Sequence, residues 1–163
     1  MRRGTFHVVA AAVLIGGAVA TAVASAAAEP PPPLPPPSPP PQATLRIEVT
    51  DLRSTRGELR LGIFNRSSGF PESRDAAVTW RSLPAATNER VMVVTLPPGE
   101  YAAVVLHDEN GNMKLDRSWG VPREGYGVTN NPKPRLRAAT YAEARFNLPP
   151  DGASRTISIQ YFQ

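Results

Sequence analysis

The residues at positions 108–112, DENGN, have the types and spacing of a cation-binding loop. Oxygen-bearing side chains recur at every second position, and a further carboxylate follows at position 116. Hard cations such as calcium require six to eight oxygen ligands, and the pattern D-x-N-x-N supplies several within one tight loop. The predicted ligands are Asp108, Asn110, Asn112, the carbonyl group of Lys114 and Asp116, with Glu124 as a late bidentate donor. Calcium is the one cofactor that the sequence predicts.

The same residues also suit a tight turn in which Asp and Asn side chains accept hydrogen bonds from their own backbone. The loop departs from the helical calcium-binding hand in two places. Met113 occupies the sixth position, where that hand has glycine, and Trp119 occupies the twelfth, where it has glutamate. No helix is predicted on either side of the loop. A metal loop and a self-bonded turn therefore both remain open interpretations.

Aromatic and basic residues farther along the loop suggest a second kind of site. Trp119 and Tyr126, with Arg123 between them, could stack on a sugar ring or hold an extended peptide. The alternative is that both rings fold inward and form a small core for the loop. Carbohydrate or peptide binding is therefore the alternative function, and a cell-envelope glycan or protein would be the partner.

Catalysis has little support in the sequence. The absence of cysteine excludes thiol nucleophiles and cysteine-ligated metals. The motifs G-x-S-x-G, S-x-x-K and H-E-x-x-H do not occur. His107 is the only histidine beyond position 7, and its neighbour Asp108 should point to the opposite face of a strand. We therefore expect a protein without enzymatic activity.

The N-terminal 28 residues have the features of a secretory signal peptide. Arg2 and Arg3 precede an apolar run at 8–24, and small residues around Ala26 fit a cleavage site. An uncleaved membrane anchor is the alternative, because the 21 residues from 8 to 28 carry no charge. In both cases the basic residues keep the N-terminus on the inner side of the membrane, and the remainder of the chain is exported. The expected location is the periplasm of a Gram-negative bacterium, or the medium.

A proline-rich linker separates this segment from the folded domain. Residues 29–42 contain ten prolines, which fix φ and remove amide donors, so we expect a polyproline II spacer. Residues 43–163 suffice for one domain, with an interspersed net charge of +3. So small an excess of positive charge gives no support to a nucleic-acid partner. A membrane partner is expected only if the N-terminal segment is retained.

The domain shows the two-residue period of β-strands. Leu45, Ile47 and Val49, for example, alternate with Arg46 and Glu48. The continuous apolar run at 101–106 predicts a central strand that is buried on both faces. Seven short strands separated by turns predict an all-β, immunoglobulin-like β-sandwich. The predicted strands are 44–50, 58–64, 77–83, 90–96, 101–107, 141–148 and 156–162.

The segments HDENGNMKLD, WGVP and EGYGVTNN, all within 101–131, resemble the exported bacterial family catalogued as domain of unknown function 2141. The resemblance covers most of 45–162, although a glycine usual in the family is Met113 here. The turn LPPGEY is similar to turns in transthyretin-like and carboxypeptidase-regulatory-like sandwiches, which implies a fold but no activity. Together these features predict an exported, non-enzymatic β-sandwich module stabilised by calcium in the loop at 108–116.

Overall fold

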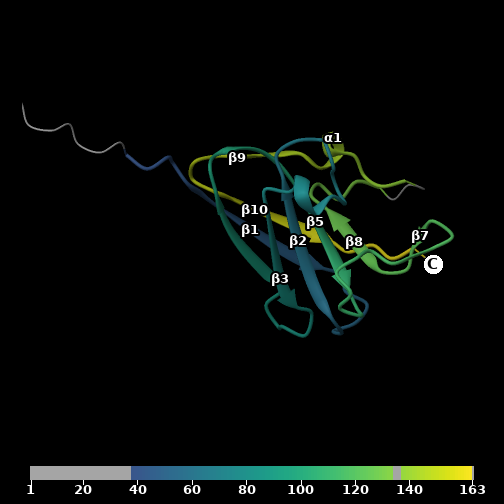
Figure 1. Cartoon of the computed structure of the whole chain (residues 1–163). Coiled ribbons are helices and arrows are strands. Elements are labelled where there is room, and N and C mark those ends of the chain that lie inside the picture. Colours follow the sequence, from purple (N-terminus) through teal and green to yellow (C-terminus); the bar gives the residue numbers. More distant parts are fainter. Residues whose placement is uncertain (1–37, 134–136, 163) are drawn as a thin grey trace, which may run out of the picture. The chain divides into compact units, whose positions relative to one another are not determined.

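The computed structural model of the chain describes residues 38–133 and 137–162 (Figure 1). The predicted signal peptide and the linker residues before position 38 lie outside the described residues. Residues 38–163 form one compact unit. In the described part of the chain, no helix is both long enough and apolar enough to cross a membrane.

Two larger β-sheets and one two-stranded hairpin make up the domain in the residues that the structure describes. In the smaller sheet β1 is central, parallel to β10 and antiparallel to β4; these are β1 (Ala43–Thr50), β4 (Val91–Leu96) and β10 (Ala153–Ser158). The larger sheet is antiparallel and has the order β3-β2-β5-β8, formed by β2 (Glu58–Phe64), β3 (Thr79–Pro84), β5 (Gly99–Asp108) and β8 (Gly125–Val128). The short elements are η1 (Arg74–Ala76), α1 (Tyr141–Ala144), β9 (Phe146–Leu148), which pairs with the start of β5, and a hairpin of β6 (Arg117–Ser118) and β7 (Val121–Pro122).

The main hydrophobic core lies between the two sheets. Alternate residues of each strand point inward, as Leu45 and Ile47 of β1 and Leu59 and Leu61 of β2 do, and all four are fully buried. Their exposed neighbours in β1 face solvent on the other side of the smaller sheet. At the edge of this core the hydroxyl group of Tyr101 donates a hydrogen bond to the carbonyl of Pro97 (2.9 Å), which closes the LPPGEY turn. The β-sandwich prediction is confirmed.

The outer face of the larger sheet carries a second apolar cluster. Phe64 of β2, Val104 of β5 and Val128 of β8 belong to it, and Phe70 packs edge-on against Phe64 with ring centres 5.2 Å apart. Residues 65–78 and the segment around α1 cover this part of the sheet. The remaining part of the same face, toward the loop that follows β5, holds the groove described below.

The first five predicted strands are confirmed with small shifts at their ends, and β5 lies at the centre of the larger sheet as expected. The prediction of one strand at 141–148 is wrong. A capping box between Thr140 and Glu143 begins a helical turn there, and only Phe146–Leu148 is a strand. The last predicted strand is shifted toward the N-terminus, because β10 ends at Ser158. The strand β8 was not predicted.

Two glycines explain why β8 has no strand-like sequence. A Cβ atom on Gly125 would lie 2.3 Å from the ring of Tyr161, and one on Gly127 would lie 2.4 Å from the carbonyl oxygen of Ser158. The C-terminal segment passes so close to β8 that only glycine fits at these positions. Two backbone hydrogen bonds between Tyr126 and Gln160, 2.9 and 3.1 Å long, join the two segments.

Candidate functional site

The loop at 108–116 folds as a turn around one buried carboxylate. Asp108, the last residue of β5, is fully buried. Its Oδ1 accepts hydrogen bonds from the amides of Gly111 (2.8 Å) and Asn112 (3.1 Å), and its Oδ2 accepts one from Met113 (2.8 Å). The backbone of Met113 has φ +67°, a conformation that favours glycine. These hydrogen bonds have the pattern of a self-bonded turn.

Three other predicted calcium ligands converge. Asn110 and Asn112 each donate a side-chain hydrogen bond to the carboxylate of Asp116, 2.6 and 2.9 Å long. The amide of Lys114 donates to the side-chain oxygen of Asn112 (2.9 Å), which places Lys114 in the same turn. In the described part of the chain, no group of three or more His, Asp or Glu side chains is arranged to hold a metal ion. Calcium binding by this loop stays a prediction.

Glu124 is buried beneath the loop and binds backbone rather than the other predicted ligands. It accepts hydrogen bonds from the amides of Glu109 (3.0 Å) and Asp116 (3.2 Å). Burial raises the pKa of Glu124, and the two amides oppose that rise. Glu124 therefore ties the two ends of the loop together.

A second tie joins the loop to the segment between β1 and β2. The carboxylate of Glu109 accepts hydrogen bonds from the guanidinium group of Arg53 and from the hydroxyl group of Ser54 (2.6 Å). Arg53 also donates to the carbonyl of Arg123 (3.0 Å). The hydrogen bond from Arg53 is the main reason that the pKa of Glu109 falls from 4.5 to about 2. We call Arg53, Ser54 and Glu109 the clamp.

His107 is a structural residue in this arrangement. It is fully buried, and its Nε2–H donates to the carbonyl of Arg56 (2.9 Å). Its Nδ1 therefore accepts the hydrogen bond from the hydroxyl group of Tyr161 (2.6 Å). Both ring nitrogens are thus occupied by partners other than Asp108.

The structure does not bring Trp119, Arg123 and Tyr126 together as one surface. Trp119 lies at the tip of the β6–β7 hairpin, where its side chain is fully exposed. Tyr126 lies on β8 and stacks on Phe162, with ring centres 5.5 Å apart. Arg123 is exposed and lies outside the groove that Tyr126 lines. The inward-folded interpretation is therefore wrong for Trp119.

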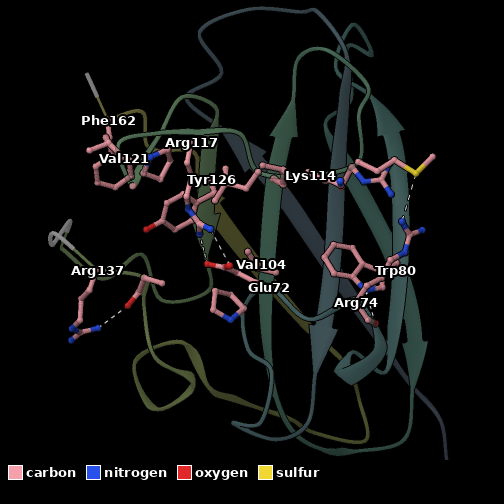
Figure 2. A pocket seen from close by; sticks show the side chains of 18 residues that line it. Glu72, Arg74, Trp80, Val104, Lys114, Arg117, Val121, Tyr126, Arg137 and Phe162 are labelled. Atoms are coloured by element: carbon pink, nitrogen blue, oxygen red, sulfur yellow. Dashed lines mark hydrogen bonds and ion pairs between the residues drawn. The ribbon is translucent and has the colours of Figure 1, made fainter.

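A groove with a volume of about 390 Å³ opens on the outer face of the larger sheet, beside this loop (Figure 2). Its floor is one row of side chains across three strands, Arg60 of β2, Leu106 of β5 and Tyr126 of β8. Trp80 and Val104 extend the floor in the next row. The indole ring of Trp80 lies over Gly62, where a Cβ atom would be only 2.8 Å from the ring. The walls come from 71–74, 113–122 and the segments around Ala138 and Phe162.

Positive charge dominates the lining of the groove. Five cationic side chains line it and a single carboxylate, Glu72, accompanies them; the cations are Arg60, Arg74, Lys114, Arg117 and Arg137. Glu72 accepts two hydrogen bonds from Arg117, which raise the pKa of that guanidinium group. Figure 2 shows this pair in the middle of the groove, with Trp80 and Arg74 toward one end and Arg137 and Phe162 toward the other.

Arg60 differs from the other cations because it is buried. Its exposure is 6%, and its nearest carboxylate oxygens belong to Glu58 (3.6 Å) and Asp108 (3.9 Å). Both contacts are ion pairs, although their separations are too long for hydrogen bonds. No hydrogen bond joins the guanidinium group of Arg60 to any residue that the structure describes.

The groove is not evident from the sequence. Arg60 alternates with Leu59 and Leu61. This pattern is typical of an outward-facing, solvent-exposed residue in a half-buried strand. The sequence contains only a weak indication of a binding site. Trp80 and Tyr126 are large aromatic residues, and the segments that contain them also contain arginine. Their proximity follows from strand register, which the sequence does not specify.

Comparison with known proteins identifies one family. The sequence model of the family described as "Uncharacterized protein conserved in bacteria (DUF2141)" matches residues 47–158, more than half of the chain. No curated protein and no solved structure matches the chain significantly.

Proposed function

The chain belongs to this family, and we propose that it is an exported, non-enzymatic binding module whose site is the groove on the larger sheet. The proposed ligand is a small organic anion with an apolar body. The description of the family assigns no activity, so the proposal rests on the geometry of the groove. Export rests on the N-terminal sequence pattern.

The observation that carries the proposal is the state of Arg60. Its guanidinium group has five N–H donors, is 6% exposed and has no hydrogen bond to a described residue. These donors border the groove, so an acceptor placed there can reach them. The acidic head group of a ligand would supply the missing acceptors through charge-assisted hydrogen bonds.

The remainder of the groove suits the apolar part of such a ligand. Val104, Leu106 and Trp80 form an apolar floor, and the stacked pair of Tyr126 and Phe162 lies at one side. Its volume of about 390 Å³ falls in the range of about 300–1,000 Å³ that is common for small-molecule sites. Two of the lining cations, Arg74 and Lys114, have no carboxylate partner among the described residues, so an anion fits better than the neutral carbohydrate of the alternative function.

Binding rather than catalysis is proposed because of the side chains that line the groove. Covalent and acid–base mechanisms need a nucleophile or proton donor beside a matched base. The only carboxylate among the lining residues, Glu72, is held by Arg117, and His107 lies elsewhere with both nitrogens bonded.

Two fluorescent dyes test the proposal. Anilinonaphthalene sulfonate and N-phenylnaphthylamine share one apolar ring system, and only the first carries an acidic group. We expect the sulfonate to bind the wild type more tightly than the neutral dye. Arg60→Gln should weaken sulfonate binding by roughly 10- to 100-fold, because a buried charge-assisted hydrogen bond contributes about 1.5–3 kcal/mol. The affinity of the neutral dye should change little.

Two further variants control the experiment. Arg46→Gln removes the same charge from an exposed position of β1 on the other sheet, and should leave both affinities unchanged. Glu72→Gln removes the carboxylate that competes for Arg117, and should tighten sulfonate binding. Equal affinities for the two dyes, or equal losses in Arg60→Gln and Arg46→Gln, would refute the proposal.

A further inference from the structure

The groove has two chemically different ends. At the end formed by β2 and β3 it is lined by Arg60, Arg74 and Lys114, which we call the basic end. Trp80 of β3 belongs to this end, because its indole N–H donates a hydrogen bond to the carbonyl of Arg74 (3.2 Å). Figure 2 shows Trp80, Arg74 and Lys114 on the same side of the groove.

The cations of the basic end are accessible to an anion in the groove. Arg60 has two ion-pair partners, at 3.6 and 3.9 Å, but no hydrogen bond to a described residue. Arg74 donates to the sulfur atom of Met113 (3.7 Å), and neither it nor Lys114 has a carboxylate partner in the described ranges. Carboxylates of the surrounding segments lower the net charge of this region, but they do not line the groove; these are Glu58, Asp108, Asp116 and Glu124.

The opposite end of the groove is aromatic, and its cation is already paired. Tyr126 of β8 stacks on Phe162, and Val121 lies beside this pair of rings in Figure 2; we call these three residues the aromatic end. Arg137 also lines this end, but it donates two hydrogen bonds to the carboxylate of Glu143, 2.8 and 2.9 Å long. The aromatic end therefore suits an apolar group better than an acidic one.

An apolar floor from β5 joins the two ends. Arg60 of β2 and Tyr126 of β8 lie in one row, two strand spacings apart, which is about 10 Å. Glu72 and Arg117 form their ion pair between the two walls, with side chains 52% and 38% exposed, whereas Val104 of the floor is only 5% exposed. The pair therefore lies toward solvent and does not interrupt the apolar floor.

We propose that the groove binds straight-chain carboxylates of medium length, with the carboxylate at the basic end and the alkyl chain extended over β5 to the aromatic end. Charge-assisted hydrogen bonds from Arg60 would hold the carboxylate, and burial of methylene groups would add affinity along the floor. A compact acid would leave one of the two ends empty, whereas the chain of octanoate or decanoate spans the distance between them. The inference rests on the proposed function, since it names the class of anion and its orientation in the same groove.

Calorimetric titration of the protein with a series of acids tests the proposal. Hexanoate, octanoate and decanoate share one head group and differ only in chain length, and octanol has the chain of octanoate without the charge. We expect the affinity to rise about two- to fourfold with each added methylene group, because each one is buried on the floor of the groove. Octanol should bind at least about tenfold more weakly than octanoate, since it cannot accept charge-assisted hydrogen bonds.

Variants at the two ends test the orientation. Phe162→Ala should weaken decanoate binding by about tenfold and hexanoate binding by less than about twofold, because only the longer chain reaches the aromatic end. Arg60→Gln should instead weaken the binding of all three acids by the same factor. Lys114→Gln, at an exposed position that the fold tolerates, should do so by about two- to fivefold. Val93→Ala, at an exposed position of β4 on the other sheet, should change no affinity.

The outcomes separate this inference from the proposed function. Equal affinities for the three acids would overturn the inference, and so would a loss of hexanoate binding in Phe162→Ala as large as the loss of decanoate binding. If the sulfonate dye still binds through Arg60 in either case, the proposed function stands. Failure of the dye and of all three acids to bind would refute both.

Discussion

Replacing Glu109 with glutamine tests how the loop is attached to the rest of the domain. The Glu109 side chain is 9% exposed, and the hydrogen bond from Arg53, followed by that from Ser54, lowers its pKa from 4.5 to about 2. A difference of about 2.5 pKa units corresponds to about 3.4 kcal/mol, at about 1.36 kcal/mol per unit. Because the Arg53 side chain is 39% exposed, solvent screening reduces this to about 1–2 kcal/mol.

The sign of the pH dependence follows from the direction of the shift. The pKa of Glu109 is lower in the folded than in the unfolded state, so ionised Glu109 stabilises the fold above pH about 4.5. That contribution is lost as the pH falls from about 4.5 to about 2. Glu109→Gln should therefore be less stable than the wild type by about 1–2 kcal/mol at neutral pH, and the two should converge near pH 2.

Urea denaturation at several pH values between these limits measures the effect. Glu48→Gln, a change at an exposed position of β1, provides the matched control and should parallel the wild type throughout. A difference between Glu109→Gln and the wild type that stays constant over the whole pH range would refute the reasoning, because a constant difference cannot come from the titration of this carboxylate.

Further predictions concern the turn around Asp108. Asp108→Ala should reduce the free energy of unfolding by about 2–4 kcal/mol in urea, because it leaves the amides of Gly111 and Met113 without an acceptor, whereas Asp151→Ala in an exposed turn should have little effect. Gly57→Ala should be more destabilising than Gly111→Ala, since both have positive φ but only the Cβ on Gly57 would meet another atom, the Asp108 carbonyl oxygen, at 2.0 Å. Bound calcium at a hundredfold excess over its Kd would add about 2.7 kcal/mol and raise the Tm by several degrees; identical melting in calcium and EDTA would contradict the calcium prediction.

The strands that line the main core could be predicted because one of their faces is buried. In β1 the alternation of Leu45 and Ile47 with exposed residues directly reflects its position over the core. The helical turn of α1 was harder to predict, because its short sequence is also compatible with a strand. A capping box at Thr140 favours the helical turn locally, and Ala144 packs into the second apolar cluster.

The groove could not be predicted, because its parts come from segments that are distant in the sequence. Arg60 and Tyr126 share a row only through their pairing with β5, and the walls depend on where two long loops lie. The sequence shows that Trp119 and Tyr126 follow β5, but not that they lie on different elements. Tyr126 belongs to β8, a strand that is difficult to recognise in the sequence because it contains two glycines. Trp119 lies at the tip of a hairpin whose turn departs from the usual residue preferences.

The central claim is that the groove binds an acidic ligand through Arg60. The most direct test is a titration of the protein with anilinonaphthalene sulfonate, followed in proton–nitrogen correlation spectra that include the side-chain N–H of arginine. The account predicts that the Nε–H signal of Arg60 and the amides of Val104, Leu106 and Tyr126 shift together as the dye binds. Shifts confined to other surfaces, or an Arg60 signal that does not move at saturation, would contradict it.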